Sequence, residues 1–248
     1  MPLSDQEVEL PAPPGYGKVV ALSPQHHAGL GVDPERRQGF GRDKHLLMLT
    51  DSEFFRAAIC YPIGLLQPAG QEQLVPVAVL GLNEGENLFV GKDGLWESGA
   101  YVPAVARRYP FCVVRVSGGA VSGQRLIGVD RAGLTASDTP LFDESGEPTS
   151  AWEQQKTLID QFEGALEISE RFCARLVDHD LLEPFDAHIR LNDGRKFTLT
   201  GLQRVSEEKL KTLDAETAGA WLVDGTLARI HAHLISLNHF PRFTERCV

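Results

Sequence analysis

The sequence predicts an α+β fold, in which a β-rich N-terminal part packs with a mainly helical C-terminal part that carries one β-hairpin. Residues 18–135 contain several apolar runs of strand length, separated by turns rather than by long helices. Residues 150–248 show helical spacing of apolar side chains around one alternating, hairpin-like stretch. Because regular helical crossovers between the strands are missing, the pattern argues against a doubly wound sheet.

The chain begins with a segment, residues 1–17, that predicts a flexible arm, because its closely spaced prolines and glycines cannot continue a regular element. A short strand is expected at 18–23 and a buried strand at 45–50, with a polar, glycine-rich loop between them. Thr50 and Glu53 have the spacing of a capping box, in which each side chain accepts a hydrogen bond from the other residue's backbone amide. This box predicts a short helix that ends before the next proline.

The rest of the β-rich part contains one tight turn and one short helical stretch. Residues 87–98 predict a hairpin, because a Lys-Asp-Gly turn separates two apolar segments. Residues 100–111 predict a short helix that a proline closes. Further strands are predicted at 63–67, 75–82, 111–116 and 124–130, the last two on either side of a Gly/Ser loop at 117–123.

Residues 136–149 predict an acidic, turn-rich link between the two parts, or an ordered functional loop. Asp143 suits an Asx-turn, in which its carboxylate accepts a hydrogen bond from an amide two residues on. Gly146 suits a left-handed backbone position. The link therefore either fixes the entry to the following helix or offers carboxylates to a ligand.

The C-terminal part, residues 150–248, is expected to be mainly helical. Ser150 and Glu153 have the spacing of a second capping box, in front of a long amphipathic helix at about 151–180. We expect the following proline to end that helix. A hairpin is predicted at about 187–204, because an Asn-Asp-Gly turn joins two alternating strands. Two more helical stretches follow, and an Asp-Gly pair interrupts the second.

The composition restricts the classes of function. The chain has 248 residues and a formal net charge of −10, and 42% of its residues are apolar, as in ordinary globular proteins. Neither half is basic, so coating a nucleic acid is excluded as a role, because that requires Lys and Arg along the phosphates. No apolar run reaches the length of a membrane span, and the first residues show no secretion leader. We therefore expect a cytoplasmic protein without membrane insertion, whose four cysteines stay reduced.

Neither the histidines nor the cysteines predict a metal site or a cofactor. His231 and His233 lie about 200° apart on a helix, so one is expected in the core and the other in solvent. The cysteines are widely spaced and sit mostly in apolar runs, where a thiol is unreactive. Ser122 lacks the glycine spacing of a nucleophile elbow. The sequence therefore leaves open whether the protein is an enzyme.

Two polar groups are candidates for ligand binding. Arg107 and Arg108 beside Tyr109 can clamp a carboxylate and stack on a ring. The structural alternative is that Tyr109 belongs to the core and the arginines pair with Glu84 or Glu86. The acidic link either binds a ligand or contacts the arginines directly. The candidate ligand-binding residues are Arg107, Arg108, Tyr109, Trp96, Asp143 and Glu144.

Four phrases of the sequence stand out together: LGLNEGENLFV at 80–90, AYVPAVARRYPF at 100–111, LFDESGEPT at 141–149 and ARIHAHLISL at 228–237. Taken in this order, they resemble the bacterial SapC-like family. The resemblance extends over nearly the whole chain from VVALSPQHHAGLGV onward. It implies no established activity and no catalytic residues, although the family is named for surface layers. The SapC-like family is distinct from a peptide-transport permease that shares its name, because that permease requires membrane spans.

The resemblance implies an accessory role in nutrient uptake or metabolite tailoring, because such proteins are often encoded near outer-membrane receptors and flavin-dependent halogenases. The leading hypothesis is a non-enzymatic protein that binds another protein, a peptide or a small molecule at the junction of the two parts. One alternative is an enzyme that acts on an amino acid or peptide carboxylate. Another is a structural homo-oligomer of the surface-layer type.

Overall fold

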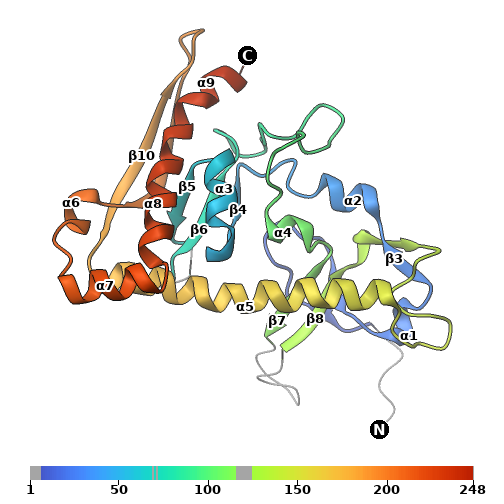
Figure 1. Ribbon diagram of the computed structural model, residues 1–248. Helices are drawn as coiled ribbons and strands as arrows, with labels where there is room; N and C mark the ends of the chain where they lie inside the picture. The colour runs from blue at the N-terminus through green and yellow to red at the C-terminus, as the bar shows by residue number, and fades with distance from the viewer. Residues whose placement is uncertain (1–6, 69, 71, 116–124, 248) are drawn as a thin grey trace. The chain divides into compact units, whose positions relative to one another are not determined.

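A computed structural model describes residues 7–68, 70, 72–115 and 125–247. The described chain is a mixture of helices and antiparallel sheets, with the helices concentrated toward the C-terminus (Figure 1). The predicted α+β fold is therefore confirmed. The predicted Gly/Ser loop at 117–123 lies outside the described residues.

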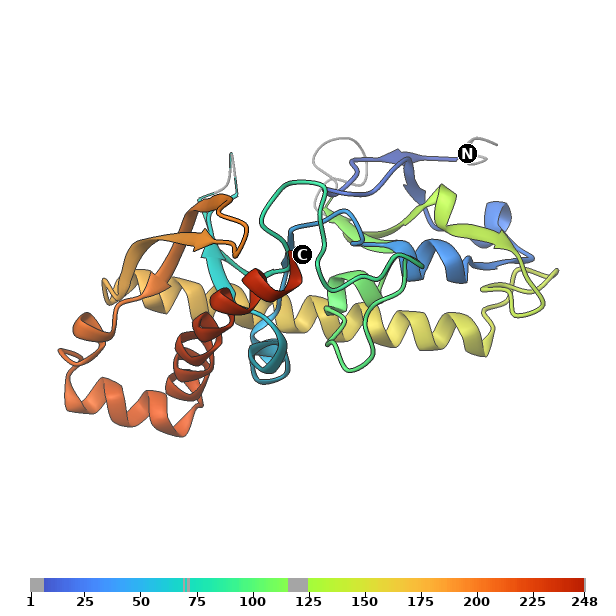
Figure 2. The ribbon, with the colours of Figure 1, turned by 90° about the horizontal axis from the view of Figure 1, so that it is seen from above.

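The chain divides into two compact units, each made of two separate stretches. Unit 1 comprises residues 1–40 and 106–163, and unit 2 comprises residues 41–105 and 164–248. The long helix α5 (Ser150–Asp178) begins in unit 1 and continues into unit 2 without a break (Figure 2). The boundaries that the sequence suggests, with an arm before residue 18 and a link at 136–149, stay a prediction.

Unit 1 is built on an antiparallel sheet whose strands lie in the order β1-β2-β8-β7. Two smaller strands, β3 and β9, pair with each other. The bounds are β1 (Glu9–Leu10), β2 (Val19–Ala21), β3 (Leu30–Val32), β7 (Phe111–Arg115), β8 (Arg125–Asp130) and β9 (Leu134–Ala136). Short helices connect them: α1 (Pro24–His27), α2 (Pro34–Gly39), α4 (Ala104–Arg107), which begins in unit 2, and the 3₁₀ turn η2 (Arg131–Gly133).

The core of unit 1 forms where α5 meets this sheet. Trp152 and Ile159 of α5 join Val20, Phe111 and Val129 of the strands in one buried cluster. A second buried cluster contains other residues of the same strands, namely Leu10, Val19, Cys112 and Val114. Because β2 and β7 supply neighbouring residues to different clusters, the alternation of side chains along a strand divides them between two apolar environments.

Unit 2 contains a five-stranded antiparallel sheet in the order β10-β11-β5-β6-β4. The helices α3 and α8 pack on each other and on β5. The strands are β4 (Leu46–Met48), β5 (Ile63–Leu66), β6 (Val75–Val79), β10 (Leu182–Arg190) and β11 (Lys196–Val205). The helical elements are η1 (Asp51–Glu53), α3 (Phe54–Cys60), α6 (Glu207–Leu210), α7 (Ala215–Val223), α8 (Thr226–Ser236), η3 (Leu237–Arg242) and α9 (Phe243–Arg246).

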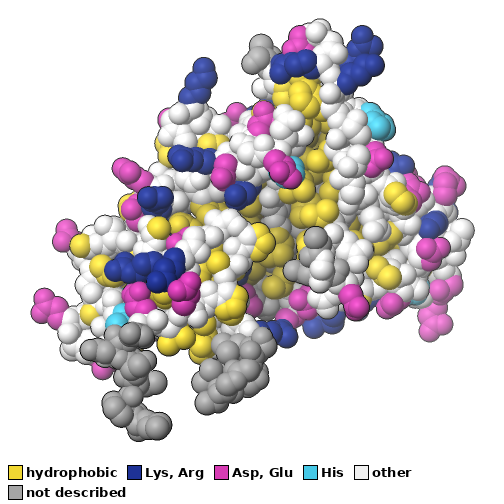
Figure 3. Space-filling model, turned by 180° about the vertical axis from the view of Figure 1, so that it is seen from behind, with side chains coloured by type: hydrophobic (Ala, Val, Ile, Leu, Met, Phe, Trp, Pro, Cys, Tyr) yellow, Lys and Arg dark blue, Asp and Glu magenta, His cyan; other side chains and the backbone are white. Residues whose placement is uncertain are grey.

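The β10–β11 hairpin confirms the hairpin predicted near 187–204. Its ladder contains a bulge between Phe185 and Ala187, opposite Gly201, whose φ of 82° is a conformation that favours glycine. Figure 3 shows basic side chains gathered at the hairpin tip; the exposed ones there are Arg190, Arg195 and Lys196.

The capping box at Thr50 forms as predicted and does more than begin a helix. The Thr50 amide donates to Glu53 Oε2 at 2.8 Å, while Glu53 Oε1 accepts from the Tyr101 hydroxyl at 2.9 Å and from the Ala104 amide at 2.7 Å. Glu53 is only 3% exposed. This buried carboxylate therefore ties the start of α3 to a segment about fifty residues further along the chain.

Two expectations about the long helix are wrong in detail. The helix begins at Ser150, so the residue before it, Thr149, provides the cap: its hydroxyl accepts from the Trp152 amide at 3.4 Å. The helix ends because Asp180 adopts a positive φ of 50° and the amides of Asp180 and Leu181 bond back to the preceding turn. Pro184 does not end it, since that residue pairs with Gln203 inside β10.

Candidate functional site

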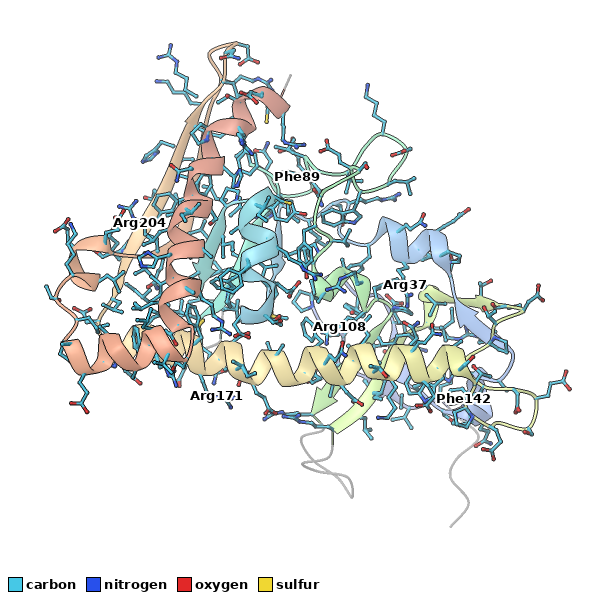
Figure 4. All side chains as sticks on the ribbon, in the orientation of Figure 1. Arg37, Phe89, Arg108, Phe142, Arg171 and Arg204 are labelled. Atoms are coloured by element: carbon cyan, nitrogen blue, oxygen red, sulfur yellow. The ribbon has the colours of Figure 1, made fainter. Side chains whose placement is uncertain are left out.

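Arg108, one of the predicted ligand-binding residues, is an interior side chain of unit 1. It is 6% exposed, and its Nη1 lies 3.0 Å from Glu163 Oε1 on α5. Its guanidinium also stacks over the ring of Phe162, 4.0 Å from the centroid. Figure 4 shows Arg108 beside the middle of α5. The pairing with an acidic residue that the sequence suggested does occur, but the partner is Glu163 rather than Glu84 or Glu86.

Tyr109 is also buried, as the structural alternative required. Its hydroxyl donates to Asp130 Oδ2 at 3.1 Å, and its ring stacks on Phe40 with centroids 4.5 Å apart. Burial raises the pKa of Tyr109 to about 12, and the Asp130 carboxylate adds to this effect. The Tyr109 carbonyl accepts a hydrogen bond from Arg37 Nε at 2.9 Å. The tyrosine therefore links α2, β8 and the segment after α4.

The acidic link folds as a self-contained turn. Asp143 Oδ1 accepts hydrogen bonds from the amides of Ser145 and Glu147 at 2.9 and 3.0 Å, and Gly146 has a φ of 85°. Hydrogen bonds from Ser145 and Glu147 lower the pKa of Asp143, because they stabilise its charged form. Glu144 is exposed at the outside of this turn. This arrangement is the structural role that the sequence offered as the alternative to ligand binding.

Within the described residues, the contacts of Arg108 and those of Asp143 do not join the two predicted patches to each other. Figure 4 places Arg108 near the middle of α5 and Phe142, the neighbour of Asp143, near its N-terminal end. Arg107 is the last residue of α4. Trp96 belongs to unit 2, where it is half-buried and bridges to Val90 across the predicted turn at 92–94. Ligand binding by these six residues stays a prediction.

Unit 2 contains a groove along one of its strands, which we call the β10 groove. Its volume is about 830 Å³. Successive residues of β10 line it, from Phe185 to Ile189, so the groove follows the strand itself. The other walls come from the end of β11, from α6 and from the junction of α8 and η3. The lining residues are Glu183, Phe185–Ile189, Arg204–Glu208, Leu234, Leu237, Asn238 and Phe240.

Strand β10 is the edge strand of its sheet, because it pairs with β11 on one side and with no other described strand. The Leu191 amide donates a hydrogen bond to the Arg195 carbonyl, so Leu191 directs its backbone polar groups toward β11. Because this direction alternates along an antiparallel strand, the residues two and four positions before Leu191 also direct theirs toward β11. By the same alternation, Asp186, His188 and Arg190 direct their backbone N–H and C=O groups away from β11. Five residues, 186–190, therefore offer an edge about 16 Å long.

The N-terminal end of this edge is closed. Lys209 Nζ bonds to the outward carbonyl of Leu182 at 2.9 Å, and Pro184 has no N–H to donate. Only the stretch from Asp186 onward therefore retains both donors and acceptors for a further strand. Proline near one end of an edge strand is a common protection against uncontrolled pairing.

The floor of the β10 groove is apolar and its rim is acidic. Phe185 and Phe240 contact each other with ring centroids 5.4 Å apart, and Arg204 stacks over Phe185. Four lining carboxylates face one arginine, which gives the lining a net charge of −3. The arginine is already engaged, since Arg204 Nε lies 2.8 Å from Glu183 Oε1. Hydrogen bonds from Ser206 and Arg204 lower the pKa of Glu183 and keep it charged.

Sequence reasoning found the hairpin but missed the groove beside it. One signal was available: Pro184 lies inside an alternating strand pattern, and proline within such a pattern indicates an edge strand. Glu207 and Glu208 lie in the first turn of α6, where acidic side chains favour the helix dipole, so their spacing alone indicates no binding role. Their position on the rim depends on the packing of α6 against β10, which the sequence does not state.

Neither a metal centre nor a membrane helix is present in the part of the chain that the structure describes. No group of three or more His, Cys, Asp or Glu side chains is placed to hold a metal ion there. Within the same residues, none of the helices combines the length and the hydropathy that crossing a bilayer requires.

No curated protein and no solved structure is significantly similar to the chain. The model of the SapC family matches residues 22–243, from β2 through η3 to the start of α9. Because this match covers nearly all of the sequence, the chain belongs to the SapC family.

Proposed function

We propose that this SapC-family chain is a binding protein that takes up an extended, basic peptide segment as an added strand along β10. The observation that carries the proposal is the unpaired edge at residues 186–190, which lies in the lining of an 830 Å³ groove. Strand addition provides affinity through main-chain hydrogen bonds, while neighbouring pockets select alternate side chains.

The side chains around the edge support a particular kind of peptide. The apolar floor formed by Phe185 and Phe240 suits an aliphatic side chain, whose burial is favourable in proportion to the area covered. The net charge of −3 on the lining suits lysine or arginine at the positions that face the rim. A segment that alternates apolar and basic residues matches both features.

Such a protein works by capture rather than by chemical conversion. The groups that carry the proposal are backbone amides, backbone carbonyls and paired or exposed carboxylates, all of which bind without forming covalent bonds. The accessory role in nutrient uptake or metabolite tailoring that the family resemblance implies is then the holding of a peptide or of a segment of a partner protein. The homo-oligomer alternative becomes the special case in which a second copy supplies the strand.

The test uses a capped pentapeptide of alternating valine and lysine with the full-length protein. We expect backbone hydrogen exchange at His188 and Arg190 to slow by about tenfold or more at saturating peptide, because their outward amides become bonded. The control is the same peptide methylated at the backbone nitrogens that would pair. If the methylated peptide protects these amides equally, strand addition is ruled out.

A pair of charge variants separates the rim from a general effect of acidity. Glu207→Gln together with Glu208→Gln removes two rim charges, whereas Glu216→Gln removes one from the first turn of α7, outside the groove. We expect the rim variant to weaken peptide binding about threefold for each charge and the α7 variant to leave it unchanged. Equal weakening by both sets would mean that net charge alone attracts the peptide.

A further inference from the structure

A second cavity in unit 2, which we call the arginine cavity, gathers three arginines in an otherwise acidic protein. Its volume is about 260 Å³, and it lies where the second half of α5 faces η1 and the junction of α7 and α8. Figure 4 shows Arg171 projecting from this half of α5. The lining residues are Asp51, Ile168, Arg171, Phe172, Arg175, Asp224, Thr226 and Arg229.

Two of the three arginines are paired with carboxylates. Arg175 Nη1 lies 2.6 Å from Asp224 Oδ2 and 3.1 Å from Thr226 Oγ1. Arg229 Nε lies 2.8 Å from Asp51 Oδ2, although its N–H is not directed at that oxygen and is left without a hydrogen bond in the described structure. Asp51 is only 2% exposed, so this pair anchors the back of the cavity.

The charge of the third arginine is not balanced by an acidic residue in the lining. Arg171 is exposed, and it makes no ion pair or hydrogen bond with the other residues that the structure describes. It lies four residues before Arg175 on α5, and like charges at this spacing repel each other. Three arginines against two aspartates give the lining a net charge of +1, whereas the whole chain carries −10.

The backbone at the start of α8 adds to this positive potential. The helix begins at Thr226, in the lining, and its N-terminal end carries a partial positive charge. The residue before it, Gly225, has a φ of 79°, and a Cβ there would lie 2.9 Å from Arg229 Nη1. A side chain at this position is therefore strained by the backbone conformation, and the end of the Arg229 side chain would have to shift to make room for it.

We propose that the arginine cavity binds the phosphate group of a small phosphorylated metabolite. The donors come from two helices: the guanidinium groups of Arg171 and Arg175 on α5, and the guanidinium group of Arg229 with the Thr226 hydroxyl on α8. Such a three-dimensional set suits a tetrahedral oxyanion with several acceptors, whereas a planar carboxylate is satisfied by one guanidinium fork. The small volume admits a phosphate with a short substituent and excludes a nucleotide.

The test measures binding of inorganic phosphate and of O-phosphoserine to the full-length protein by calorimetry, with acetate as the planar anion. We expect both phosphates to bind and acetate to bind more weakly. Arg171→Gln is expected to weaken phosphate binding at least about tenfold, because it removes the uncompensated charge-assisted donor. The matched control is Arg56→Gln, which removes an exposed arginine of α3 outside the cavity.

Each outcome decides the proposal. Loss of phosphate binding in Arg171→Gln but not in Arg56→Gln supports it, as does stronger binding of O-phosphoserine than of acetate. Absence of phosphate binding by the unchanged protein overturns it, and so does equal weakening by both variants or equal binding of acetate. The result is independent of the β10 groove, because the two cavities share no lining residue.

Discussion

His233 is expected to make unit 2 sensitive to mild acid. The side chain is 1% exposed on α8; its Nε2 accepts a hydrogen bond from the Val205 amide at 3.1 Å and its Nδ1 lies 2.8 Å from the Ile63 carbonyl. Both bonds form together only when the ring is neutral and Nδ1 carries the proton. The imidazole therefore joins α8 to two strands of the sheet in a single protonation state.

The direction of the pH effect follows from the pKa of this ring. Burial lowers the pKa of His233 from 6.5 to about 4, against the opposing effect of the bond to Ile63. Between those pH values His233 binds a proton in the unfolded chain but stays neutral in the folded chain. The free energy of unfolding therefore decreases as the pH falls from about 6.5 toward 4. At pH 5 the loss amounts to about 2 kcal/mol, and it is absent above about pH 7.5.

The assay is urea unfolding at pH 7.5 and pH 5.0, for the natural protein and for His233→Gln. Glutamine offers an amide donor and acceptor but does not titrate, so the variant should lose about 2 kcal/mol less than the natural protein between the two pH values. The effects of other histidines whose pKa burial lowers, such as the buried His27 and the half-buried His45, are present in both proteins and cancel in the comparison. Equal losses in the two proteins would refute the reasoning.

Three further predictions concern single side chains. Arg108→Met leaves Glu163 without its partner in the interior of unit 1 and should lower the free energy of unfolding by about 3 kcal/mol, while adding Glu163→Leu should recover at least half of it, as measured by urea unfolding. Gly225→Ala should lower the free energy of unfolding by about 1–2 kcal/mol, because of the φ of 79° and the contact with Arg229. Gly164→Ala, in the interior of α5 with open space around it, should instead raise the free energy of unfolding by about 0.5–1 kcal/mol. A destabilised Gly164→Ala would contradict this difference. Burial raises the pKa of the thiols of Cys112 and Cys173 to about 11 and 12, so a thiol reagent at pH 8 should modify Cys60 and Cys247 much faster in the folded protein; equal rates would mean that these interiors open readily.

The sequence predicted those features of the fold that depend only on interactions between neighbouring residues. The capping box at Thr50, the tight turn of the β10–β11 hairpin and the interruption of the last helix at Gly225 each depend on a few neighbouring residues. Helical periodicity alone predicted that one of His231 and His233 is buried and the other exposed, and the structure shows that His233 is the buried one. These features need no knowledge of the rest of the chain.

The candidate site depended on pairings that local patterns do not contain. Arg108 pairs with Glu163, 55 positions away, and many acidic residues were equally eligible partners in the sequence. The left-handed residue that ends α5 is Asp180, where glycine would have given a clear signal. Among the described strands, β10 lies at the end of its sheet, and this place depends on the order of all the strands, which is a property of the whole sheet.

The division of each unit into two stretches has a consequence for synthesis on the ribosome. Residues 41–105 emerge early, yet the strands β10 and β11 that complete their sheet are made only after residue 181. The partial sheet of β4, β5 and β6 therefore stays incomplete, with the open side of β5 exposed, while the second stretch of unit 1, residues 106–163, is translated. A cut at any single position divides at least one unit between the two fragments. Limited proteolysis should therefore yield nicked molecules whose fragments stay associated, rather than two independent domains.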